Sequence, residues 1–268
     1  MTAKKFSTEI RRATLRCLHS QGSGHVGGSL SVADALAVLY THHMDVDPQN
    51  PKRPQRDMLV LSKGHAGPAW YATLALKGFF PMDWLDTLNK IGTKLPSHAN
   101  LTLTPGVDMT AGSLGQGLSC ACGLALGLKA QGDTSHFVYV ITGDGELQEG
   151  QNWEGAMFAA HHKLDNVVVL VDNNKLQIDG ETQNVCKMED LEAKFRAFGF
   201  ETTRVDGHDH QALHQAICNA KVRNGVPHCI VMDTVKGKGV SIYEQMGASN
   251  HSTTVNDEQY ALALSELQ

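Results

Sequence analysis

The stretch "HFVYVITGDGELQEG" (136–150) ends an apolar run abruptly at two glycines that bracket one aspartate. The apolar run predicts a short buried strand. Gly143 permits a tight turn after it, and Gly145 lets backbone N–H groups approach an anion. Asp144 then projects a hard oxygen ligand from the carboxyl end of the strand. A simple strand-to-helix turn capped by Asp144 is the structural alternative, and this motif alone leaves both interpretations open.

Strands and helices alternate outward from this stretch. Helices are predicted over 7–20, 31–40, 66–77, 113–130, 151–162, 188–199 and 211–225, and strands over 58–62, 136–142, 166–172, 201–206 and 228–235. Continuous apolar strands between helices predict an α/β fold, a three-layer arrangement with a mostly parallel sheet covered by helices on both faces. We expect residues 1–268 to form a single domain, with a C-terminal loop from about residue 236 over the site.

Composition narrows the class of protein. The net charge is −5, which gives no reason to expect a nucleic-acid partner. No apolar segment has the length of a signal peptide or a membrane span, so we expect no membrane association. The six cysteines form no C-x-x-C pair, which favours a reducing, cytoplasmic compartment.

The next strand along the chain brings a second set of oxygen ligands. In "LVDNNKLQIDG" (170–180) Asn174 follows the strand as Asp144 follows the one before. Asp144 and Asn174 supply one formal negative charge, which suits Mg²⁺ that completes its octahedron with phosphate oxygens and water. A G-x-G-x-x-G pattern at 22–27 follows a helix instead of a strand, so we reject a dinucleotide site there.

Three histidines lie in glycine- or proline-flanked turns: His25, His65 and His98. For each one alone, an ordinary loop histidine is the better interpretation. Together with a metal–diphosphate motif, their similar settings favour a common active site.

At this point the sequence resembles a known family. "GDGELQEGQNWEGAMFAAHHKLDNVVVLVDNNKLQIDG" (143–180) is similar to the thiamine diphosphate motif, and its details resemble transketolase. Five further stretches agree in the same order: "SGHVGGSLS", "LSKGHAGPAWYATL", "LPSHAN", "DMTAGSLGQGLSCACGLALGLK" and "TVKGKGVS". The resemblance covers the N-terminal, diphosphate-binding domain, as in the N-terminal subunit of a split, two-gene transketolase.

The resemblance implies a role for each matching residue. Asp144, Asn174 and the carbonyl of Leu176 would bind Mg²⁺, or Ca²⁺ or Mn²⁺ in its place. Gly145, His65 and His251 would contact the diphosphate, and Gly112 and Leu114 would line the pyrimidine. His25, His98 and His251 would face the sugar, although Ser252 stands where the family usually has glycine after this histidine. Glu149 and Glu154 resemble interface carboxylates, with a solvated helix face as the alternative for Glu154. Lys236 and Lys238 have two interpretations, contact with phosphate and a solvated loop, of which we favour the solvated loop.

The resemblance also implies a reaction and a partner. The reaction would transfer a two-carbon ketol unit from a ketose or its phosphate to an aldose or its phosphate. The pyrimidine-binding domain would come from a C-terminal transketolase subunit, in an α2β2 assembly docked on the small-residue helix 113–130. The alternatives are a component of another thiamine diphosphate enzyme (deoxyxylulose-phosphate-synthase-like or 2-keto acid dehydrogenase-like) and a non-catalytic relic.

Overall fold

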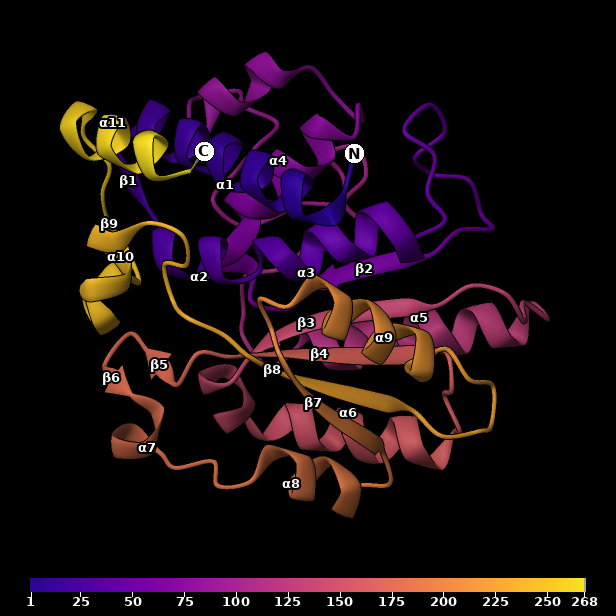
Figure 1. Ribbon diagram of the computed structural model, residues 1–268. Helices are drawn as coiled ribbons and strands as arrows, with labels where there is room; N and C mark the ends of the chain where they lie inside the picture. Colours follow the sequence, from indigo (N-terminus) through magenta and orange to yellow (C-terminus); the bar gives the residue numbers. More distant parts are fainter. Residues whose placement is uncertain (268) are drawn as a thin grey trace.

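A five-stranded parallel sheet forms the centre of the computed structural model, which describes residues 1–267 and confirms the α/β prediction (Figure 1). The strand order is β2-β3-β4-β8-β7. Their bounds are β2 (Met58–Leu61), β3 (Val138–Gly143), β4 (Val167–Asn173), β8 (His228–Asp233) and β7 (Glu201–Asp206). Two short antiparallel pairs lie outside the sheet: β1 (Ser23–Gly24) with β9 (Thr253–Thr254), and β5 (Leu176–Gln177) with β6 (Gly180–Glu181).

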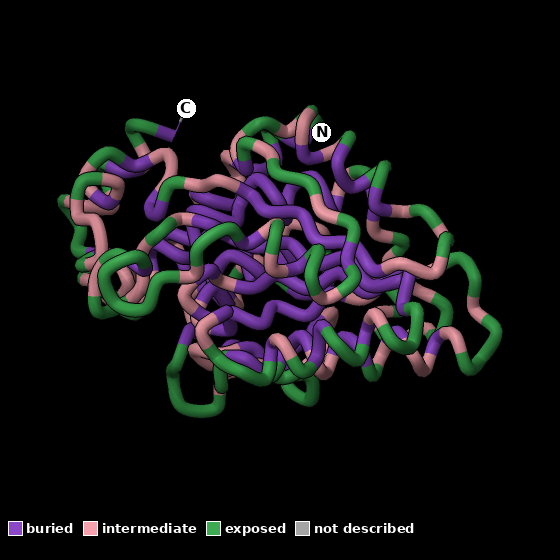
Figure 2. Tube along the Cα trace, turned by 90° about the horizontal axis from the view of Figure 1, so that it is seen from below, coloured by how far each residue is buried: buried purple, intermediate pink, exposed green. Residues whose placement is uncertain are grey.

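Helices cover both faces of the sheet. One face carries α1 (Ala3–Gln21), α3 (Ala33–Val38), α4 (Gly67–Leu76) and α9 (His210–Ala220). The other carries α5 (Gly117–Ala130), α6 (Gly150–His161) and α8 (Leu191–Ala197). Successive side chains of a strand point to opposite faces, so Val168 packs into the first core and Val169 into the second. Figure 2 shows the resulting buried band through the middle of the molecule.

The remaining elements are short. They are α2 (Val26–Ser31), the π-helical turn η1 (Leu39–His43), the 3₁₀ turns η2 (Gly64–Ala66), η3 (Met82–Thr87), η4 (Gly145–Gln148) and η5 (Gly247–Asn250), α7 (Thr182–Val185), α10 (Ser241–Gln245) and α11 (Asp257–Glu266).

Several predicted helix boundaries are wrong, and the helix expected over 211–225 already ends at Ala220. The helix expected over 31–40 begins earlier, at Val26, and breaks at Val32 into α2 and α3. The helix expected over 113–130 begins only at Gly117, because Gly112 and Gly115 have φ values of 150° and 87° that no continuing helix allows. Residues 113–116 therefore form a loop beside the sheet's carboxyl edge.

The predicted C-terminal loop is also only partly correct. The chain does leave β8 along the carboxyl edge of the sheet, but α10 and η5 interrupt the expected loop before α11. The physical reason is burial: the Tyr243 side chain is fully buried, and Asn250 donates to the Tyr243 carbonyl at 2.6 Å. Gln268 lies outside the described residues.

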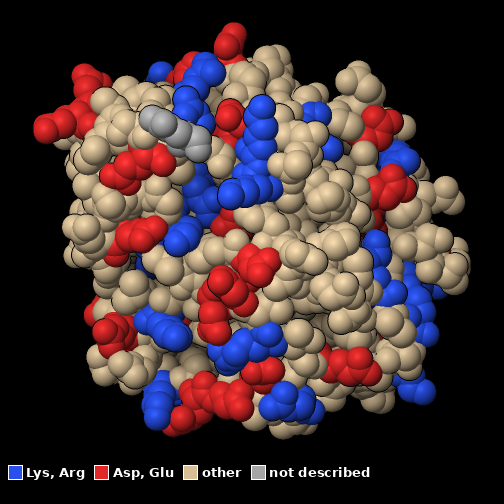
Figure 3. All heavy atoms as spheres, in the orientation of Figure 1, with Lys and Arg blue, Asp and Glu red and all other residues tan. Residues whose placement is uncertain are grey.

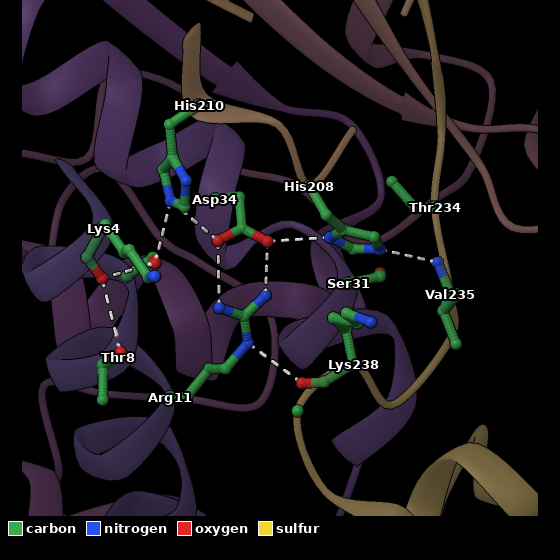
Figure 4. A network of polar contacts seen from close by, with 12 residues as sticks. Lys4, Thr8, Arg11, Ser31, Asp34, His208, His210, Thr234, Val235 and Lys238 are labelled. Carbon is green, nitrogen blue, oxygen red and sulfur yellow. Dashed lines mark hydrogen bonds and ion pairs between the residues drawn. The ribbon is translucent and has the colours of Figure 1, made fainter. Parts of the chain in front are cut away.

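A buried ion cluster ties this C-terminal segment to the N-terminal helices (Figure 4). Asp34 of α3 pairs with the Arg11 guanidinium of α1, and both side chains are almost fully buried. His208 Nδ1 donates to Asp34 at 2.8 Å, and its Nε2 accepts from the Val235 N–H at 2.8 Å. Arg11 Nε donates to the Lys238 carbonyl at 2.9 Å. The cluster therefore fixes residues 235–238, which run past the candidate site.

The surface mixes both signs of charge. Lys and Arg side chains alternate with Asp and Glu side chains over the face drawn in Figure 3. Among the described residues, no helix combines the length and apolar character needed to cross a membrane.

Candidate functional site

A cavity of about 330 Å³ opens at the carboxyl ends of β3 and β4. These strands are parallel neighbours, and Gly143 pairs with Asp172 in their register, so the loops that follow them meet at one edge. The cavity collects seven of the ten residues predicted for the site: His65, Leu114, Asp144, Gly145, Asn174, Leu176 and His251. A larger hollow of about 550 Å³ adjoins it and shares Asp144, Asn174 and Leu176 with it, but none of the predicted histidines lines this hollow.

Asp144 is the most unusual acid in this cavity. Its side chain is only 3% exposed, and it accepts hydrogen bonds from the Gly145 N–H at 2.9 Å and the Lys175 N–H at 2.6 Å. Burial and the neighbouring carboxylate of Asp172 raise the Asp144 pKa to about 7. The carboxylate is therefore short of positive charge. Gly145, predicted to contact a diphosphate, donates its N–H to Asp144 in this structure.

Asp172 organises the residues at the end of β4, next to Asp144. It is fully buried at the end of β4 and pairs with the Lys63 ammonium, which is 1% exposed. Lys63 Nζ also donates to the Gly28 carbonyl at 3.0 Å. Asn174 Nδ2 donates to Asp172 at 3.0 Å, and Asn174 Oδ1 accepts from the Leu176 N–H at 3.1 Å. This pair thus orients Asn174 and the start of β5.

Lys236 is not in a solvated loop, and that expectation is wrong. The side chain is 4% exposed, and its Nζ lies 3.4 Å from the Leu176 carbonyl and 3.3 Å from His251 Nδ1. The Asp34 cluster fixes residues 235–238, so Lys236 is turned inward. Burial and the nearby Lys63 lower its pKa to about 8. Lys238 does keep its ammonium partly exposed, near Glu244.

Four histidines lie close together, from segments as far apart as residues 25 and 251, and two of them, His65 and His251, line this cavity. The His25 ring centroid lies 5.4 Å from that of His65, 5.9 Å from His98 and 5.3 Å from His251. His65 and His251 are 4.8 Å apart. Burial and neighbouring positive charge lower the pKa of His25, His65 and His251, that of His251 to about 4. At neutral pH each of these three rings therefore offers one donor and one acceptor nitrogen.

Gly112 and Leu114 lie on the loop that precedes α5. Leu114 lines the main cavity, whereas Gly112 borders a separate hollow of about 210 Å³ and packs against His98. Glu146 holds this loop in place: its carboxylate accepts from the Ser62 hydroxyl, from the Gly115 N–H at 3.0 Å and from the Gly143 N–H at 3.0 Å. Gly112 therefore stands apart from the cavity of the predicted metal ligands.

Glu149 and Glu154 are both exposed, at the start and in the first turns of α6. Their role at an interface stays a prediction, and their exposure on one helix is compatible with it.

Sequence reasoning missed Lys63, Glu146 and Asp172. A signal existed for two of them. Lys63 and Asp172 end apolar runs, as Asp144 does, and a charged residue at the carboxyl end of a buried strand points to the same edge of the sheet. Glu146 carries no such pattern, because its three partners come from separate segments.

The donor set fits a divalent cation together with a diphosphate. Carboxylate, amide and carbonyl oxygens are available from Asp144, Asn174 and Leu176, and hard oxygen ligands are those that Mg²⁺ prefers. The raised Asp144 pKa shows a buried carboxylate that a cation would stabilise. Lys236, whose ammonium has no carboxylate partner among the ion pairs of residues 1–267, supplies the positive charge that an anion would meet.

Comparison with known proteins gives one consistent family. Residues 2–267 match the family described as "Transketolase, thiamine diphosphate binding domain". The 6-deoxy-6-sulfo-D-fructose transketolase subunit SqwG of Clostridium sp. (strain MSTE9) is 49% identical over 97% of this chain and 94% of the relative. An apulose-4-phosphate transketolase subunit from Actinobacillus succinogenes is 38% identical over 99% of this chain and 95% of the relative.

A solved structure agrees with these sequence matches. The transketolase from Leishmania mexicana superposes with a TM-score of 0.92 at 32% identity. It covers the whole of this chain, which spans about two fifths (41%) of that transketolase.

Proposed function

Since this chain belongs to the transketolase family and carries its thiamine diphosphate-binding domain, we propose that it is the diphosphate-binding subunit of a two-subunit transketolase. The assembled enzyme would transfer a two-carbon ketol unit between a ketose and an aldose or their phosphates. The observation that carries the proposal is the single cavity that joins an under-satisfied buried carboxylate, Asp144, to the neutral rings of His65 and His251.

The proposed ligands of the cofactor follow from the geometry above. Asp144, Asn174 and the Leu176 carbonyl would hold Mg²⁺, and Lys236, His65 and His251 would face the diphosphate oxygens. Lys63 is a positioning residue, because its ion pair with Asp172 orients Asn174. Bound thiamine diphosphate supplies the carbanion and electron-sink chemistry of ketol transfer.

The histidines would handle the sugar hydroxyls. A ketose donor carries several hydroxyls that need hydrogen-bond partners, and a hydroxyl proton must be held or moved when the carbon–carbon bond breaks. The His25 ring lies 5.9 Å from that of His98 and 5.3 Å from that of His251, so the three side chains would meet one sugar together. This observation favours a sugar substrate over a 2-keto acid, which has no such hydroxyls.

The partner subunit would dock on α5 and α6. On α5, Gly123 is exposed, and a Cβ added at Gly123 or Gly127 would meet no atom within 4 Å. On α6, Met157 is 57% exposed and Phe158 is 40% exposed. Small residues beside exposed apolar side chains allow close packing of a second chain. Glu149 and Glu154 flank this surface, and an α2β2 assembly would bring them to its second site.

The experiment is purification of the chain from its own host with Mg²⁺ and thiamine diphosphate, followed by native mass spectrometry and a ketol-transfer assay. We expect equal copies of a second chain and two cofactors per α2β2. The assay should include 6-deoxy-6-sulfo-D-fructose beside ketose phosphates, because that sugar is named for the relative from Clostridium. Recovery of the chain alone, without cofactor or activity at excess diphosphate, would favour the non-catalytic relic.

A surface variant separates docking from folding. Gly123→Leu should abolish assembly while the chain itself becomes more stable by about 0.5–1 kcal/mol, because glycine is a poor helix former. Ala261→Leu, at an exposed position of α11, is the control that should leave assembly unchanged. Unimpaired assembly of Gly123→Leu would place the partner elsewhere.

A further inference from the structure

A second group of side chains with metal-ligating atoms lies away from the cofactor cavity. It consists of His43, at the end of η1, with His214 and Cys218 on α9. One ligand atom from each of the three residues lies within 4.8 Å of the others. We call these three residues the His/Cys cluster.

Local backbone geometry brings the cluster together. His214 and Cys218 are four residues apart on α9, so they share one helix face, and their Nε2 and Sγ atoms are 3.7 Å apart. His43 ends a π-helical turn in which the Met44 N–H donates to the Leu39 carbonyl at 2.9 Å. Such turns are rare and are frequent at functional sites. Here the turn directs His43 to α9, where its Nε2 lies 3.0 Å from His214 Nδ1.

The cluster is separate from the cofactor cavity. α9 runs back across the sheet between β7 and β8, so its last turns lie at the amino ends of the strands. η1 likewise precedes the start of β2. The cavity with Asp144 is at the opposite, carboxyl edge of the sheet. The two sites can therefore be loaded and tested independently.

The donor atoms select a class of ion. Two imidazoles and one thiolate are ligands that Zn²⁺ and Co²⁺ prefer, whereas Mg²⁺ prefers oxygen. Zinc bond lengths place tetrahedral ligand atoms roughly 3.3–3.8 Å apart. With one ligand atom from each residue the three atoms lie within 4.8 Å of one another, so ion binding requires the side chains to rotate and the His43–His214 hydrogen bond to be given up. The Lys221 ammonium donates to the His43 carbonyl at 3.4 Å, a second contact between the end of α9 and the end of η1. The fourth coordination position of the ion would be taken by a water molecule or by His42. The His42 ring is exposed and lies 5.1 Å from that of His214.

We propose that His43, His214 and Cys218 bind one Zn²⁺-class divalent ion that fastens α9 to the end of η1. Cys218 is exposed, so the ion can enter from solvent, and binding would release the thiol proton. A bound ion would join two segments that are 171 residues apart in the chain. It would thus stabilise the face of the sheet opposite α5 and α6 without touching the cofactor.

Cobalt titration of the full chain tests the proposal, because a thiolate ligand gives Co²⁺ a charge-transfer band that oxygen ligands do not. We expect one equivalent of Co²⁺ to produce this band with tetrahedral ligand-field absorption, and Zn²⁺ to displace it. Cys218→Ser should lose the band completely. Cys186→Ser is the matched control, an exposed cysteine outside the cluster, and should retain it. Asp144→Asn should also retain it, which separates this site from the cofactor metal.

Two results would overturn the proposal: absence of the band in the unmodified chain, or its persistence in Cys218→Ser. Because Cys218 is exposed, its variant should fold, and an unchanged circular dichroism spectrum verifies this. Zn²⁺ should raise the Tm of the unmodified chain and of Cys186→Ser, but not that of Cys218→Ser. An equal rise in Tm in all three would assign the zinc to another site.

Discussion

Asp34 and Asp144 are nearly equally buried, at 2% and 3% exposure, yet their surroundings treat the negative charge in opposite ways. Asp34 accepts hydrogen bonds from Arg11 and His208 and lies 3.0 Å from His210 Nε2 (Figure 4). Burial opposes its ionisation, but these three partners hold the Asp34 pKa well below its usual range. Asp144 has two backbone N–H partners and no ion pair among the described residues, and its pKa is raised to about 7.

The difference separates structure from function. A buried carboxylate with a full set of partners is part of the fold, because removal of one partner leaves an uncompensated buried charge and strongly lowers stability. A buried carboxylate with too few partners, facing a cavity, has a free-energy deficit that a bound cation removes. An aspartate side chain therefore stabilises the fold at residue 34 and is a candidate metal ligand at residue 144.

Asp34→Asn should give the largest loss of stability. It leaves the buried Arg11 guanidinium without its counter-charge, which costs about 3–5 kcal/mol of the free energy of unfolding. Urea unfolding followed by circular dichroism measures it. The control is Asp86→Asn, which breaks the more exposed pair with Arg16 and should cost about 0–1 kcal/mol. Equal losses in the two variants would remove the contrast.

Asp144→Asn should instead lower activity and spare the fold. We expect ketol transfer by the assembled enzyme to fall at least ~100-fold, since even indirect metal-site changes cost about 10- to 100-fold. The metal-free chain should be as stable as the unmodified chain at pH 7, or more stable, because the unfavourable buried charge is gone. Asp179→Asn, an exposed acid on the loop after β5, is the control. A loss of stability as large as that of Asp34→Asn would contradict this interpretation.

Glu146→Gln tests an intermediate case. Burial raises the Glu146 pKa, although Ser62, Gly115 and Gly143 all donate to its carboxylate. Replacing one acceptor oxygen by an amide nitrogen leaves a buried donor unpaired, at a cost of about 1–3 kcal/mol. Because Gly115 is next to Leu114, the apparent affinity for thiamine diphosphate should weaken as well. Titration calorimetry on the assembled enzyme measures it, with Glu258→Gln on the surface of α11 as control.

The contributions of Asp144 and Asp34 to stability should change with pH in opposite directions. The folded-state pKa of Asp144, about 7, is above the unfolded value of 3.8, so the folded state holds its proton longer. Its contribution to stability therefore falls as pH rises from about 4 to 7, by ~2 kcal/mol between pH 5 and 7. Asp34 has a lowered pKa, so its contribution is present above about pH 4 and is lost on acidification below that.

Thermal unfolding of the metal-free chain and of Asp144→Asn across about pH 5–7 measures the first contribution. The Tm of the unmodified chain should fall relative to the variant as pH rises, and Mg²⁺ with thiamine diphosphate should cancel the fall. A constant difference in Tm over this range would show that Asp144 does not titrate there.

Local sequence patterns predicted most of the fold. The stretches "VYVI" and "VVVLV" are apolar throughout because both faces of their strands are buried, and this pattern predicts a sandwiched parallel sheet before any contact is known. The same reasoning predicted that Asp144 and Asn174 lie together, since parallel neighbours end at one edge, and both line one cavity. The start of α5 was missed because the backbone of Gly112 and Gly115, and not the small-residue pattern, decides it.

The sequence by itself determined the layered α/β fold, the family and seven of the residues that line the candidate cavity, because each of these is written in short contiguous motifs. Only the tertiary structure decided which polar groups are satisfied. It showed Lys236 turned inward, Lys63 paired with Asp172, and His43 beside His214 and Cys218. Charge balance in a buried site depends on partners from distant segments, and no local pattern in the chain records which of them meet.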